Sequence, residues 1–507
     1  MSIRRNEWLA AVAKYQLDPG KPARERVWSP GLECVPRARL REIQSEKLAA
    51  AFAYLYEDSP FYRTKFTRAG LAPKDVRSVD DLQRIPITTK EELIQDQAET
   101  PPWGTFTPLA AERWTSAGWM VFTSPGTTTA LPRVFRHTLH DLEMWSWLGA
   151  RALWSMGVRS KDLAINCFGY GPNVAFWCLH YALHRLGCPV IPGGGTNTQR
   201  RAFFIETYRP TVLFCTPSYA LHLGRAMQGM GYDPEKSSIR LIVTAAEPGP
   251  GVPATKERIE GLWGAELHDN FGCTAAAMTP LGYTCQEEVQ QHERAVGVHV
   301  MEDAYIAEVV DPKTLALVPE GVEGVLVVSN LYSESQPILR YKMGDWTTLT
   351  TEPCACGRTH ARALGGLHGR WDSLIKIRGL SFFPSTIEDS IRRHPDLGDE
   401  FRVEITSVDD LDRLKITVEP SSAIPKDSYV APRERLRRDL QGALGVDVEV
   451  ELVPYGVLPR QPSQTGRIVD RRIVDRRRGA PAPPGGGVEP ERDGAGETEP
   501  AWPRSFT

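Results

Sequence analysis

A short loop rich in small and hydroxyl-bearing residues has the composition of a phosphate-binding loop. Ser124, Gly126, Thr127 and Thr128 follow the apolar pair Val121-Phe122. Small residues in such a loop let backbone N–H groups and hydroxyls surround phosphate oxygens without crowding by side chains. A plain Ser/Thr/Gly turn has the same composition, so the loop by itself is compatible with either structure.

Further motifs stand in order along the chain on the C-terminal side of this loop. They read TAAEPG at 244–249, HDNFGCT at 268–274, LRYKMGD at 339–345, GRWD at 369–372 and DSLIKIRGLSFFPS at 372–385. Together with the loop, this ordered set resembles the adenylate-forming enzymes, most closely the phenylacetate–CoA ligase family of aryl-acid ligases. The resemblance runs from about residue 48 to residue 475. A set of motifs in the right order is hard to obtain by accident, so the resemblance favours a phosphate loop over a plain turn.

The resemblance implies a nucleotide site. Residues 245–248 match the segment whose backbone lies along the adenine, and Phe271 matches the aromatic residue that stacks on the purine. Asp345 matches the carboxylate that holds the ribose hydroxyls, and Arg370 matches the arginine near the ribose and phosphate. A core aromatic and a surface ion pair are the ordinary alternatives. The residues implied to bind the nucleotide are Ser124, Gly126, Thr127, Thr128, Ala245, Ala246, Glu247, Pro248, Asp269, Asn270, Phe271, Gly272, Thr274, Asp345 and Arg370.

Several positions depart from the family pattern. Thr129 and Ala130 stand where the phosphate loop usually has Gly and Lys, which removes one positive charge. Ala275 stands where a Glu helps to hold Mg²⁺ against the ATP phosphates. Arg467 stands where a Lys approaches the acyl phosphate; arginine keeps the charge but is longer and planar. Arg467 and Thr127 are the implied catalytic residues, and the departures predict weakened or re-purposed adenylation.

A second constellation lies apart from the nucleotide motifs. Cys354 and Cys356 form a Cys-X-Cys pair. Cys285 and then His299 precede this pair in the sequence. Some members of the phenylacetate–CoA ligase family have a Cys/His/Cys/Cys zinc site at these positions. Thiolates and one imidazole fill the tetrahedral shell of zinc and leave no open position, so the implied site is structural. The alternatives are a set of unrelated reduced cysteines and a histidine, or a site in which His292 is the fourth ligand.

The acid pocket is expected in the loops after the central strands. Aromatic side chains in these loops would make a flat apolar slot suited to an aryl ring, although each of them could equally belong to the hydrophobic core. The candidates are Phe168, Tyr170, Phe176, Trp177, Ser218 and Tyr219.

We expect an α/β protein to position these residues. It should have more than one domain, because 507 residues are too many for a single core. Short β-rich runs alternate with helical ones over 121–270, which predicts a mostly parallel, helix-covered sheet. We therefore expect a large N-terminal domain over 1–371, with mixed and parallel sheets and a β-rich zinc subdomain at about 280–368. A small mobile α+β domain at 372–478 should follow, with Asp372 as its hinge, and then a disordered tail at 479–507 rich in Pro, Gly and Glu.

Composition excludes several classes of protein. The net charge of −3 gives no general attraction to nucleic acid or anionic membranes, and no run of about 18 apolar residues suggests a membrane span. The nine cysteines are odd in number and scattered, and the N-terminal segment does not resemble a secretory signal. These features predict a cytoplasmic protein with reduced cysteines.

The resemblance predicts a ligase that uses ATP and Mg²⁺ to activate an aromatic carboxylic acid as an acyl-adenylate. Transfer of the acyl group to CoA or to a carrier-protein thiol would follow, with Zn²⁺ as a structural ion and a homodimer as a possible assembly. The first alternative is an ATP-dependent diazotase that activates nitrite for transfer to an aryl amine. The second is a catalytically impaired homologue that binds nucleotide or acid, which Ala275 and Arg467 together suggest.

Overall fold

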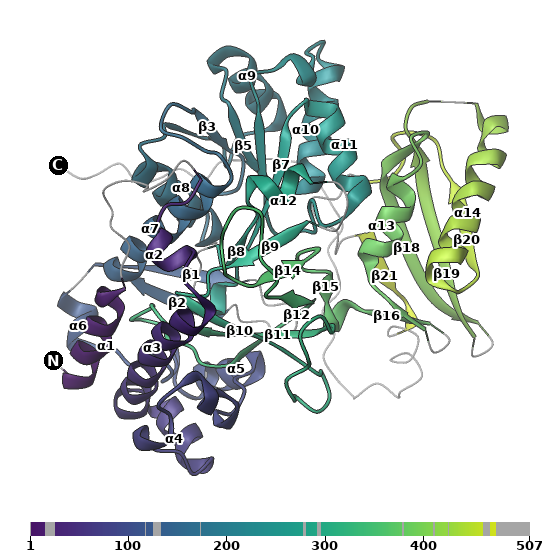
Figure 1. The fold of residues 1–507 in the computed structure, drawn as a ribbon. Coiled ribbons are helices and arrows are strands. Elements are labelled where there is room, and N and C mark those ends of the chain that lie inside the picture. The colour runs from purple at the N-terminus through teal and green to yellow at the C-terminus, as the bar shows by residue number, and fades with distance from the viewer. Residues whose placement is uncertain are drawn as a thin grey trace, which may run out of the picture.

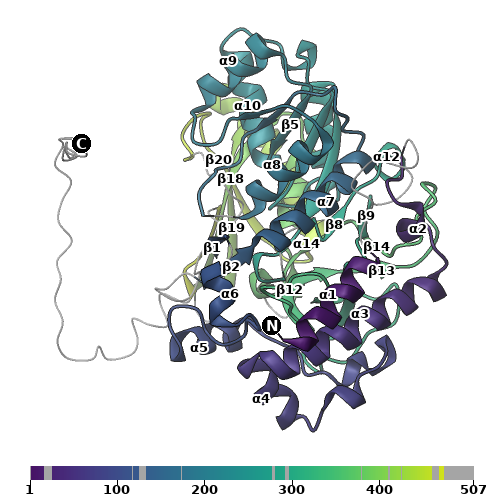
Figure 2. The ribbon, with the colours of Figure 1, turned by 90° about the vertical axis from the view of Figure 1, so that its left-hand side faces the viewer.

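The protein is described by a computed structural model that covers most of the chain. It describes residues 2–15, 26–116, 118–124, 133–172, 174–276, 280–291, 296–377, 380–408, 411–423, 425–459 and 467–472. The tail predicted at 479–507 lies outside this set. Figures 1 and 2 show a large body and a smaller C-terminal unit beside it.

The largest sheet within the described residues has nine strands. Its parallel part runs in the order β4-β3-β5-β6-β7, and an antiparallel part continues it through β8, β9, β14 and β13. The parallel strands are β3 (Ala164–Asn166), β4 (Val190–Pro192), β5 (Val212–Cys215), β6 (Leu241–Thr244) and β7 (Glu266–Phe271). The antiparallel strands are β8 (Gly282–Tyr283), β9 (Gly297–Val300), β13 (Leu349–Thr350) and β14 (Arg362–Leu364). Every residue of β3, β5 and β6 is buried, as expected for parallel strands covered on both faces.

Helices cover both faces of this sheet. Successive residues of a strand point to opposite faces, so alternate residues of β5 contact different sets of helices. Val212 and Phe214 face a core that includes residues of α7 (Leu139–Ser155) and α8 (Val174–Leu186). Leu213 and Cys215 face a second core with residues of α9 (Thr198–Tyr208), α10 (Pro217–Gly229) and α11 (Pro253–Trp263). The fold class predicted from the alternation of strands and helices is therefore confirmed.

N-terminal helices and a second sheet complete the large body. The helices are α1 (Ile3–Lys14), α2 (Pro30–Glu33), α3 (Arg37–Asp58), α4 (Pro60–Arg68), α5 (Lys90–Glu99) and α6 (Ala111–Ser116). The second sheet is antiparallel, with β10 (Tyr305–Val310), β11 (Gly324–Asn330), β12 (Tyr341–Thr347) and β15 (Gly369–Arg370). A hairpin of β1 (Trp119–Ser124) and β2 (Arg133–Thr138) flanks the predicted phosphate loop. The segment 280–368 is thus divided between two sheets, because β8, β9, β13 and β14 extend the nine-stranded one.

The C-terminal unit has a hydrophobic core of its own, which begins at Ile375 and ends at Val450. Its strands are β16 (Ile375–Ile377), β17 (Leu380–Phe382), β18 (Leu397–Val408), β19 (Leu411–Pro420), β20 (Val448–Leu452) and β21 (Ile468–Asp470), and its helices are α13 (Pro384–Arg392) and α14 (Val430–Leu444). α13 faces α11 of the large body (Figure 1).

Short helical turns connect these elements. They are α12 (Gln286–Gln290), η1 (Pro73–Asp75), η2 (Val79–Arg84), η3 (Pro234–Lys236), η4 (Thr274–Ala276), η5 (Trp371–Ser373) and η6 (Lys426–Tyr429). Across the described part of the chain, helices that combine the length and apolar character needed to cross a bilayer are absent.

Alanine should have opposite effects at two helical glycines, one packed closely between α7 and α8 and one in open space on α11. A Cβ at Gly149 in α7 would lie 2.7 Å from the Cβ of Ala182 in α8. Gly149→Ala should therefore lower the free energy of unfolding by about 1–3 kcal/mol through overpacking. Gly261 in α11 has nothing within 4 Å of the added Cβ, so Gly261→Ala should raise it by up to about 1 kcal/mol through helix propensity. Thermal denaturation of both variants is the measurement, and shifts of the same sign would contradict this account of the packing.

Candidate active site

Loops after the parallel strands gather most of the residues predicted to bind nucleotide and acid. Strands β3, β5, β6 and β7 are neighbours in the sheet and run in the same direction. Their carboxyl ends therefore lie at one edge, where ligands of open α/β sheets bind. The segments that begin at Cys167, Thr216, Ala245 and Gly272 all leave the sheet there.

Glu247 links the predicted adenine segment to the predicted acid pocket. Its carboxylate accepts a hydrogen bond from the backbone N–H of Ser218 at 3.1 Å, and the Ser218 hydroxyl lies 2.9 and 2.7 Å from its two oxygens. Ser218 is in the first turn of α10, where the helix dipole favours a carboxylate. Burial raises the pKa of Glu247, and the nearby charge of Glu388 raises it further, while Ser218 and Arg467 lower it.

The backbone of the adenine segment is held in an unusual conformation. Ala246 has φ = 75°, in the left-handed region that residues with a Cβ rarely adopt. Such strain persists where the surrounding structure fixes it, and it is common at ligand sites. Asn270 contributes to that fixing, because its side-chain amide donates to the carbonyl of Thr244 at 2.9 Å, one residue before the segment.

Asp269 is a carboxyl buried beneath the same segment. A Cβ added at Gly249 would lie 3.4 Å from its Oδ1, and one added at Gly366 would lie 3.6 Å from its Oδ2. Burial raises the pKa of Asp269 to about 8, against hydrogen bonds from the Asn270 backbone amide and the Thr244 hydroxyl that lower it. Asp269 therefore lies buried beneath the segment at 245–248, and this burial is the main cause of its raised pKa.

The segment after β7 provides an aromatic wall. Phe271 is 7 % exposed and packs against Gly282, where any larger residue would clash with its ring. Gly272 and Thr274 follow it, and Thr274 begins η4. Ala275, in η4, is 2 % exposed and has no oxygen side chain, so the position expected to carry a magnesium ligand supplies none.

Asp345 and Arg370 stand opposite each other on neighbouring strands of the second sheet. The guanidinium Nη1 of Arg370 lies 3.9 Å from Oδ2 of Asp345 and donates to the carbonyl of Met343 at 3.1 Å. Gly344 has φ = +87°, and a Cβ there would lie 2.9 Å from Nη2 of Arg370. A glycine at 344 is therefore required for the arginine to lie along this strand.

Arg133 belongs to this cluster, and the sequence motifs did not identify it. It pairs with Ser124 across the hairpin that flanks the phosphate loop, and its Nη1 donates to the hydroxyl of Tyr341 at 3.1 Å. The charges of Asp345 and Arg133 both act on the thiol of Cys273, so the hairpin, η4 and the second sheet meet here. The sequence offered one signal for it: Arg133 is a cation just after the predicted loop, in which Ala130 stands where a lysine is expected.

Most of the predicted phosphate loop lies outside the described residues. Gly126, Thr127, Thr128, Thr129 and Ala130 lie outside the described residues. Of the predicted loop residues, Ser124 is placed as the last residue of β1, with its backbone alone described.

Part of the predicted acid pocket forms an aromatic and imidazole cluster. The hydroxyl of Tyr170 receives a hydrogen bond from the side chain of Asn166 at 3.1 Å and lies 3.1 Å from Nδ1 of His180. Trp177 packs edge-on against Tyr170, with ring centroids 5.2 Å apart. Sequence reasoning missed Asn166 and His180, which carry no aromatic signal of the kind used to find their neighbours.

Three other residues were predicted to line the acid pocket, and the structure describes the side chains of two of them. Phe168 is buried, which also fits a core role, and the side chain of Phe176 lies outside the described part of the molecule. Tyr219 bonds through its hydroxyl to Thr198 at 3.2 Å and lies under Arg201, whose guanidinium carbon is 4.8 Å from the ring centroid.

Arg467 comes from the C-terminal unit and is 2 % exposed. Its Nη1 lies 3.6 Å from Glu388 and its Nη2 lies 3.5 Å from Glu400, with the guanidinium carbon 5.1 Å from the centroid of the Phe401 ring. Its Nε and Nη1 are buried and have no hydrogen-bond acceptor among the described residues. Its charge lowers the pKa of Glu247, which belongs to the edge of the sheet where the strand loops converge. Asp372, the predicted hinge, lies in η5 between the two units, and its side chain lies outside the description.

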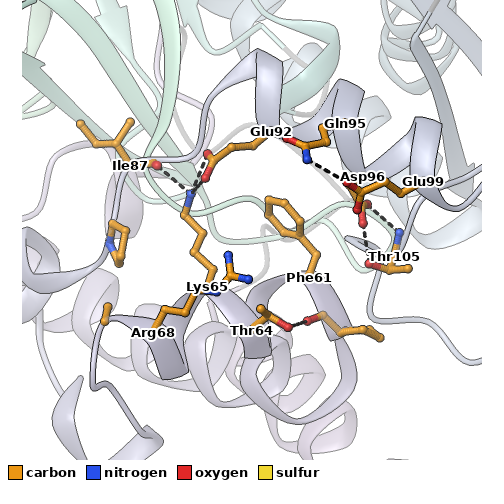
Figure 3. A pocket seen from close by; sticks show the side chains of 13 residues that line it. Phe61, Thr64, Lys65, Arg68, Ile87, Glu92, Gln95, Asp96, Glu99 and Thr105 are labelled. Carbon is orange, nitrogen blue, oxygen red and sulfur yellow. Dashed lines mark hydrogen bonds and ion pairs between the residues drawn. The ribbon is translucent and has the colours of Figure 1, made fainter.

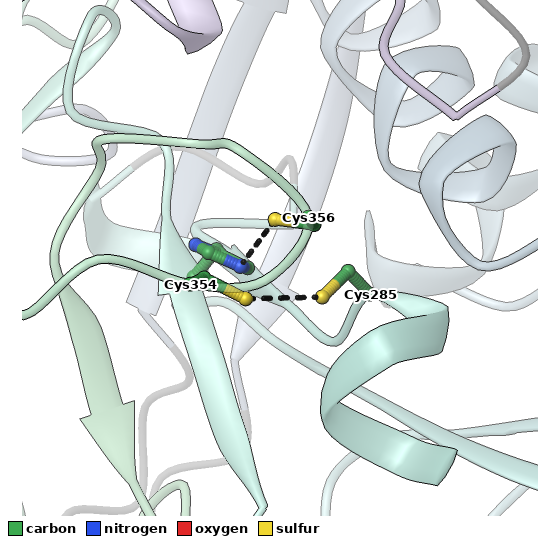
Figure 4. Close-up of side chains that lie close together, drawn as sticks. Cys285, Cys354 and Cys356 are labelled. Carbon is green, nitrogen blue, oxygen red and sulfur yellow. Dashed lines mark hydrogen bonds between the residues drawn. The ribbon is translucent and has the colours of Figure 1, made fainter. Parts of the chain in front are cut away.

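Cys285, His299, Cys354 and Cys356 come together in space, with their ligand atoms within 4.8 Å of one another (Figure 4). The Sγ atoms of Cys285 and Cys354 are 3.8 Å apart, and Sγ of Cys356 is 3.4 Å from Nε2 of His299. Zn–S bonds of about 2.3 Å and Zn–N bonds of about 2.0 Å at tetrahedral angles put S–S at about 3.8 Å and S–N at about 3.5 Å. These two separations are close to those of a tetrahedral zinc shell. His292, the alternative ligand, lies outside the described residues.

Elements from distant parts of the chain hold these four residues. His299 is in β9, Cys285 precedes α12, and the loop between β13 and β14 carries Cys354 and Cys356. The backbone N–H of Arg358 lies 3.5 Å from Sγ of Cys356, and its side chain donates to Glu33 of α2 at 2.7 Å.

A separate pocket of about 680 Å³ lies between α4 and α5 (Figure 3). None of the predicted site residues lines it. Lys65 in this pocket donates to the carbonyl of Ile87 at 2.8 Å and to Glu92 at 2.5 and 2.7 Å. Because its ammonium is already paired, we assign the pocket no role in the site.

Comparison with known proteins finds similar families and relatives over most of the chain. The family described as AMP-binding enzyme matches residues 65–332, and the family described as AMP-binding enzyme C-terminal domain matches residues 379–472. The chain is 35 % identical to a phenylacetate–coenzyme A ligase of Thermus thermophilus, with 89 % of this chain and 100 % of the relative covered. It is 30 % identical to one of Escherichia coli, with 86 % and 95 % covered.

Solved structures of a 2-hydroxyisobutyryl-CoA ligase are also similar. The structure in the postadenylation state with 2-HIB-AMP has a TM-score of 0.83 and 28 % identity, covering 93 % of this chain and 98 % of that one. The same ligase with CoA in the thioesterification state has a TM-score of 0.67 and 29 % identity, covering 91 % and 96 %. The arrangement of the two units in this chain is therefore closer to the postadenylation structure.

The buried Asp269 predicts a pH dependence of stability. Its pKa is raised in the folded state, so between its unfolded pKa near 4 and about 8 the folded protein holds a proton that the unfolded chain has lost. The free energy of unfolding should therefore fall as pH rises through this window, by up to about 4 kcal/mol from pH 5 to pH 8. Asp269→Asn stays neutral and should lack this contribution to the pH dependence. Denaturant unfolding at both pH values measures the difference, and equal slopes for wild type and variant would contradict the assignment.

Proposed function

Because this chain belongs to the family of AMP-binding enzymes, we propose that it activates an aromatic carboxylic acid with ATP as an acyl-adenylate and passes the acyl group to coenzyme A. The observation that carries this proposal is the 35 % identity to a phenylacetate–coenzyme A ligase over its full length. Acyl-AMP and CoA, named in the structures of the 2-hydroxyisobutyryl-CoA ligase, support the same two half-reactions. The proposal is supported independently by the structure, in which the loops after the parallel strands converge and the C-terminal unit contributes the cation Arg467.

In the first half-reaction the acid carboxylate would attack the α-phosphate of ATP, giving acyl-AMP and pyrophosphate. Residues 245–248 would lie along the adenine with Phe271 on its face, and Asp345 would hold the ribose hydroxyls beside Arg370. The chain would contribute mainly by positioning the reactants and stabilising charge, the two main sources of catalysis in phosphoryl transfer. The cluster of Tyr170, Trp177 and His180 would receive the aryl ring.

Arg467 would stabilise the negative charge that develops at the α-phosphate. Its buried Nε and Nη1, which lack acceptors among the described residues, are the donors available to a phosphate oxygen. Ala275 offers no ligand to Mg²⁺, so we derive no step through a protein-held magnesium ion at that position. In the second half-reaction the thiolate of CoA would attack the acyl carbonyl and release AMP.

We also propose a structural zinc ion held by Cys285, His299, Cys354 and Cys356. Its support is the set of three thiols and one imidazole within 4.8 Å of one another, with one S–S and one S–N separation close to those of a tetrahedral shell. The ion would join α12, β9 and the β13–β14 loop and supply no chemistry to the reaction. All nine cysteines lie in the described residues, and none of them forms a disulfide. This supports a reducing cytoplasmic location.

Product analysis tests the ligase proposal. With ATP, CoA and a panel of aryl acids, the enzyme should release AMP, pyrophosphate and aryl-CoA in equal amounts, measured by liquid chromatography and mass spectrometry. Arg467→Ala should lower adenylate formation about 10²-fold, the loss typical for removing one preorganised donor. Arg471→Ala is the matched control, since Arg471 is exposed and pairs with Glu404 at 3.0 Å in the same segment.

The proposal fails if ADP forms in place of AMP, or if Arg467→Ala behaves like wild type. Parallel reactions with nitrite and an aryl amine cover the diazotase alternative: turnover there, with none on any acid, would replace a ligase by a diazotase. Absence of pyrophosphate under every condition would favour the binding-homologue alternative.

Metal analysis tests the zinc proposal. Purified protein should carry about one zinc per chain, and Cys354→Ser should lose both the metal and thermal stability, because binding energy at such sites is folding energy. Cys188→Ser is the control: its thiol donates to the carbonyl of Asp162 at 3.0 Å, a bond that a serine hydroxyl also makes, and it should keep the zinc. Equal zinc content in wild type and Cys354→Ser would rule out this ligand set.

A further inference from the structure

The two units meet through a charged contact that involves none of the residues implied to bind nucleotide or acid. Asp399, in β18 of the C-terminal unit, accepts a hydrogen bond from Nε of Arg225 at 2.5 Å through Oδ2. Its Oδ1 accepts from Nη1 of Arg258 at 2.9 Å. Arg225 is in α10 and Arg258 in α11, so one carboxylate of the small unit lies between two helices of the large body.

Two of the three side chains in this contact are shielded from water, and the third, Arg225, is 37 % exposed. The side chain of Asp399 is 10 % exposed and that of Arg258 is 14 % exposed. Burial raises the pKa of Asp399, but the charges of Arg225, Arg392 and Arg258 outweigh it and the pKa is lowered. Partly buried pairs are screened much less than surface pairs, so losing one partner has a large effect.

Arg258 also caps a helix of the C-terminal unit. Its Nε donates to the carbonyl of Arg392 at 2.6 Å, and its Nη2 donates to those of His394 at 2.6 Å and Ile391 at 3.4 Å. These carbonyls lie at the C-terminal end of α13, where free carbonyls and the helix dipole favour a cation. The guanidinium therefore fixes both the position and the direction of α13 relative to α11.

Two further hydrogen bonds cross the same interface, one donated from each side. The backbone N–H of Ala254, in the first turn of α11, donates to Oδ1 of Asp389 at 3.4 Å, and Arg392 donates to the hydroxyl of Thr255. All these partners separate if the C-terminal unit turns away from α10 and α11. They belong to the orientation of the unit in this structure, which has a TM-score of 0.83 to the postadenylation structure of the relative and 0.67 to its thioesterification structure.

We propose that Asp399, held between Arg225 and Arg258, is the positioning residue that keeps the C-terminal unit in the orientation for adenylation, and that this contact opens before thioester formation. The inference rests on the proposed function, in which Arg467 stabilises the charge at the α-phosphate in the first half-reaction. α13 carries Glu388, the ion-pair partner of Arg467, so fixing α13 on α11 also fixes the place of Arg467. Asp399 touches neither substrate and acts through that placement.

The half-reactions of Asp399→Asn, measured separately, test this proposal. Adenylation, followed as acid-dependent exchange between ATP and pyrophosphate, should slow by about tenfold or more, because one buried charge loses its partner. Thioester formation from supplied aryl-adenylate and CoA should keep its rate or increase. Asp399→Glu retains the charge and should recover part of the exchange rate.

Asp396→Asn is the matched control. Asp396 pairs with Arg435 inside the C-terminal unit, so both half-reactions should stay at the wild-type rate. Equal slowing of both half-reactions by Asp399→Asn, or slowing of neither, would overturn the proposal. Small-angle X-ray scattering supplies a readout independent of catalysis: Asp399→Asn should move the profile away from that of the compact arrangement, and an unchanged profile would overturn the proposal even if no acid supports exchange.

Discussion

The carboxylate of Glu247 is the point at which the separate parts of the site meet. It fixes the first turn of α10 through Ser218, and it lies within the fields of Glu388 and Arg467 from the C-terminal unit. A buried acid with a raised pKa is stable there because it accepts several hydrogen bonds and has a cation nearby. The predicted adenine segment and the first turn of α10 are thereby joined through one side chain, on whose pKa the charges of the C-terminal unit also act.

The replacement of lysine by arginine at position 467 suits this environment. A planar guanidinium can lie over the ring of Phe401 and face Glu388 and Glu400 at the same time. Lysine would offer a compact, strongly hydrated charge with a larger desolvation penalty at a residue that is 2 % exposed. Ala275 carries no carboxylate, and Arg133 supplies a cation on β2, opposite Ser124 in the hairpin.

Several features followed from the sequence because they depend on local order. Alternating apolar runs predicted the parallel sheet, and residue type with family order predicted the convergence of Cys285, His299, Cys354 and Cys356. Other features depend on contacts between segments far apart in the chain, which no local pattern encodes. The meeting of Asp399 with Arg225 and Arg258 is one, and the pairing of Arg358 with Glu33 is another. The division of 280–368 between two sheets likewise reflects strand pairing that short β-rich runs leave open.

The most direct measurement of the central claim follows one oxygen atom. If a carboxylate attacks the α-phosphate, an aryl acid labelled with ¹⁸O in both carboxylate oxygens must pass one labelled oxygen to AMP and keep the other in the thioester. Mass spectrometry of AMP after turnover should therefore show a single added ¹⁸O. Unlabelled AMP, or label found in inorganic phosphate, would contradict acyl-adenylate formation and with it this account of the site.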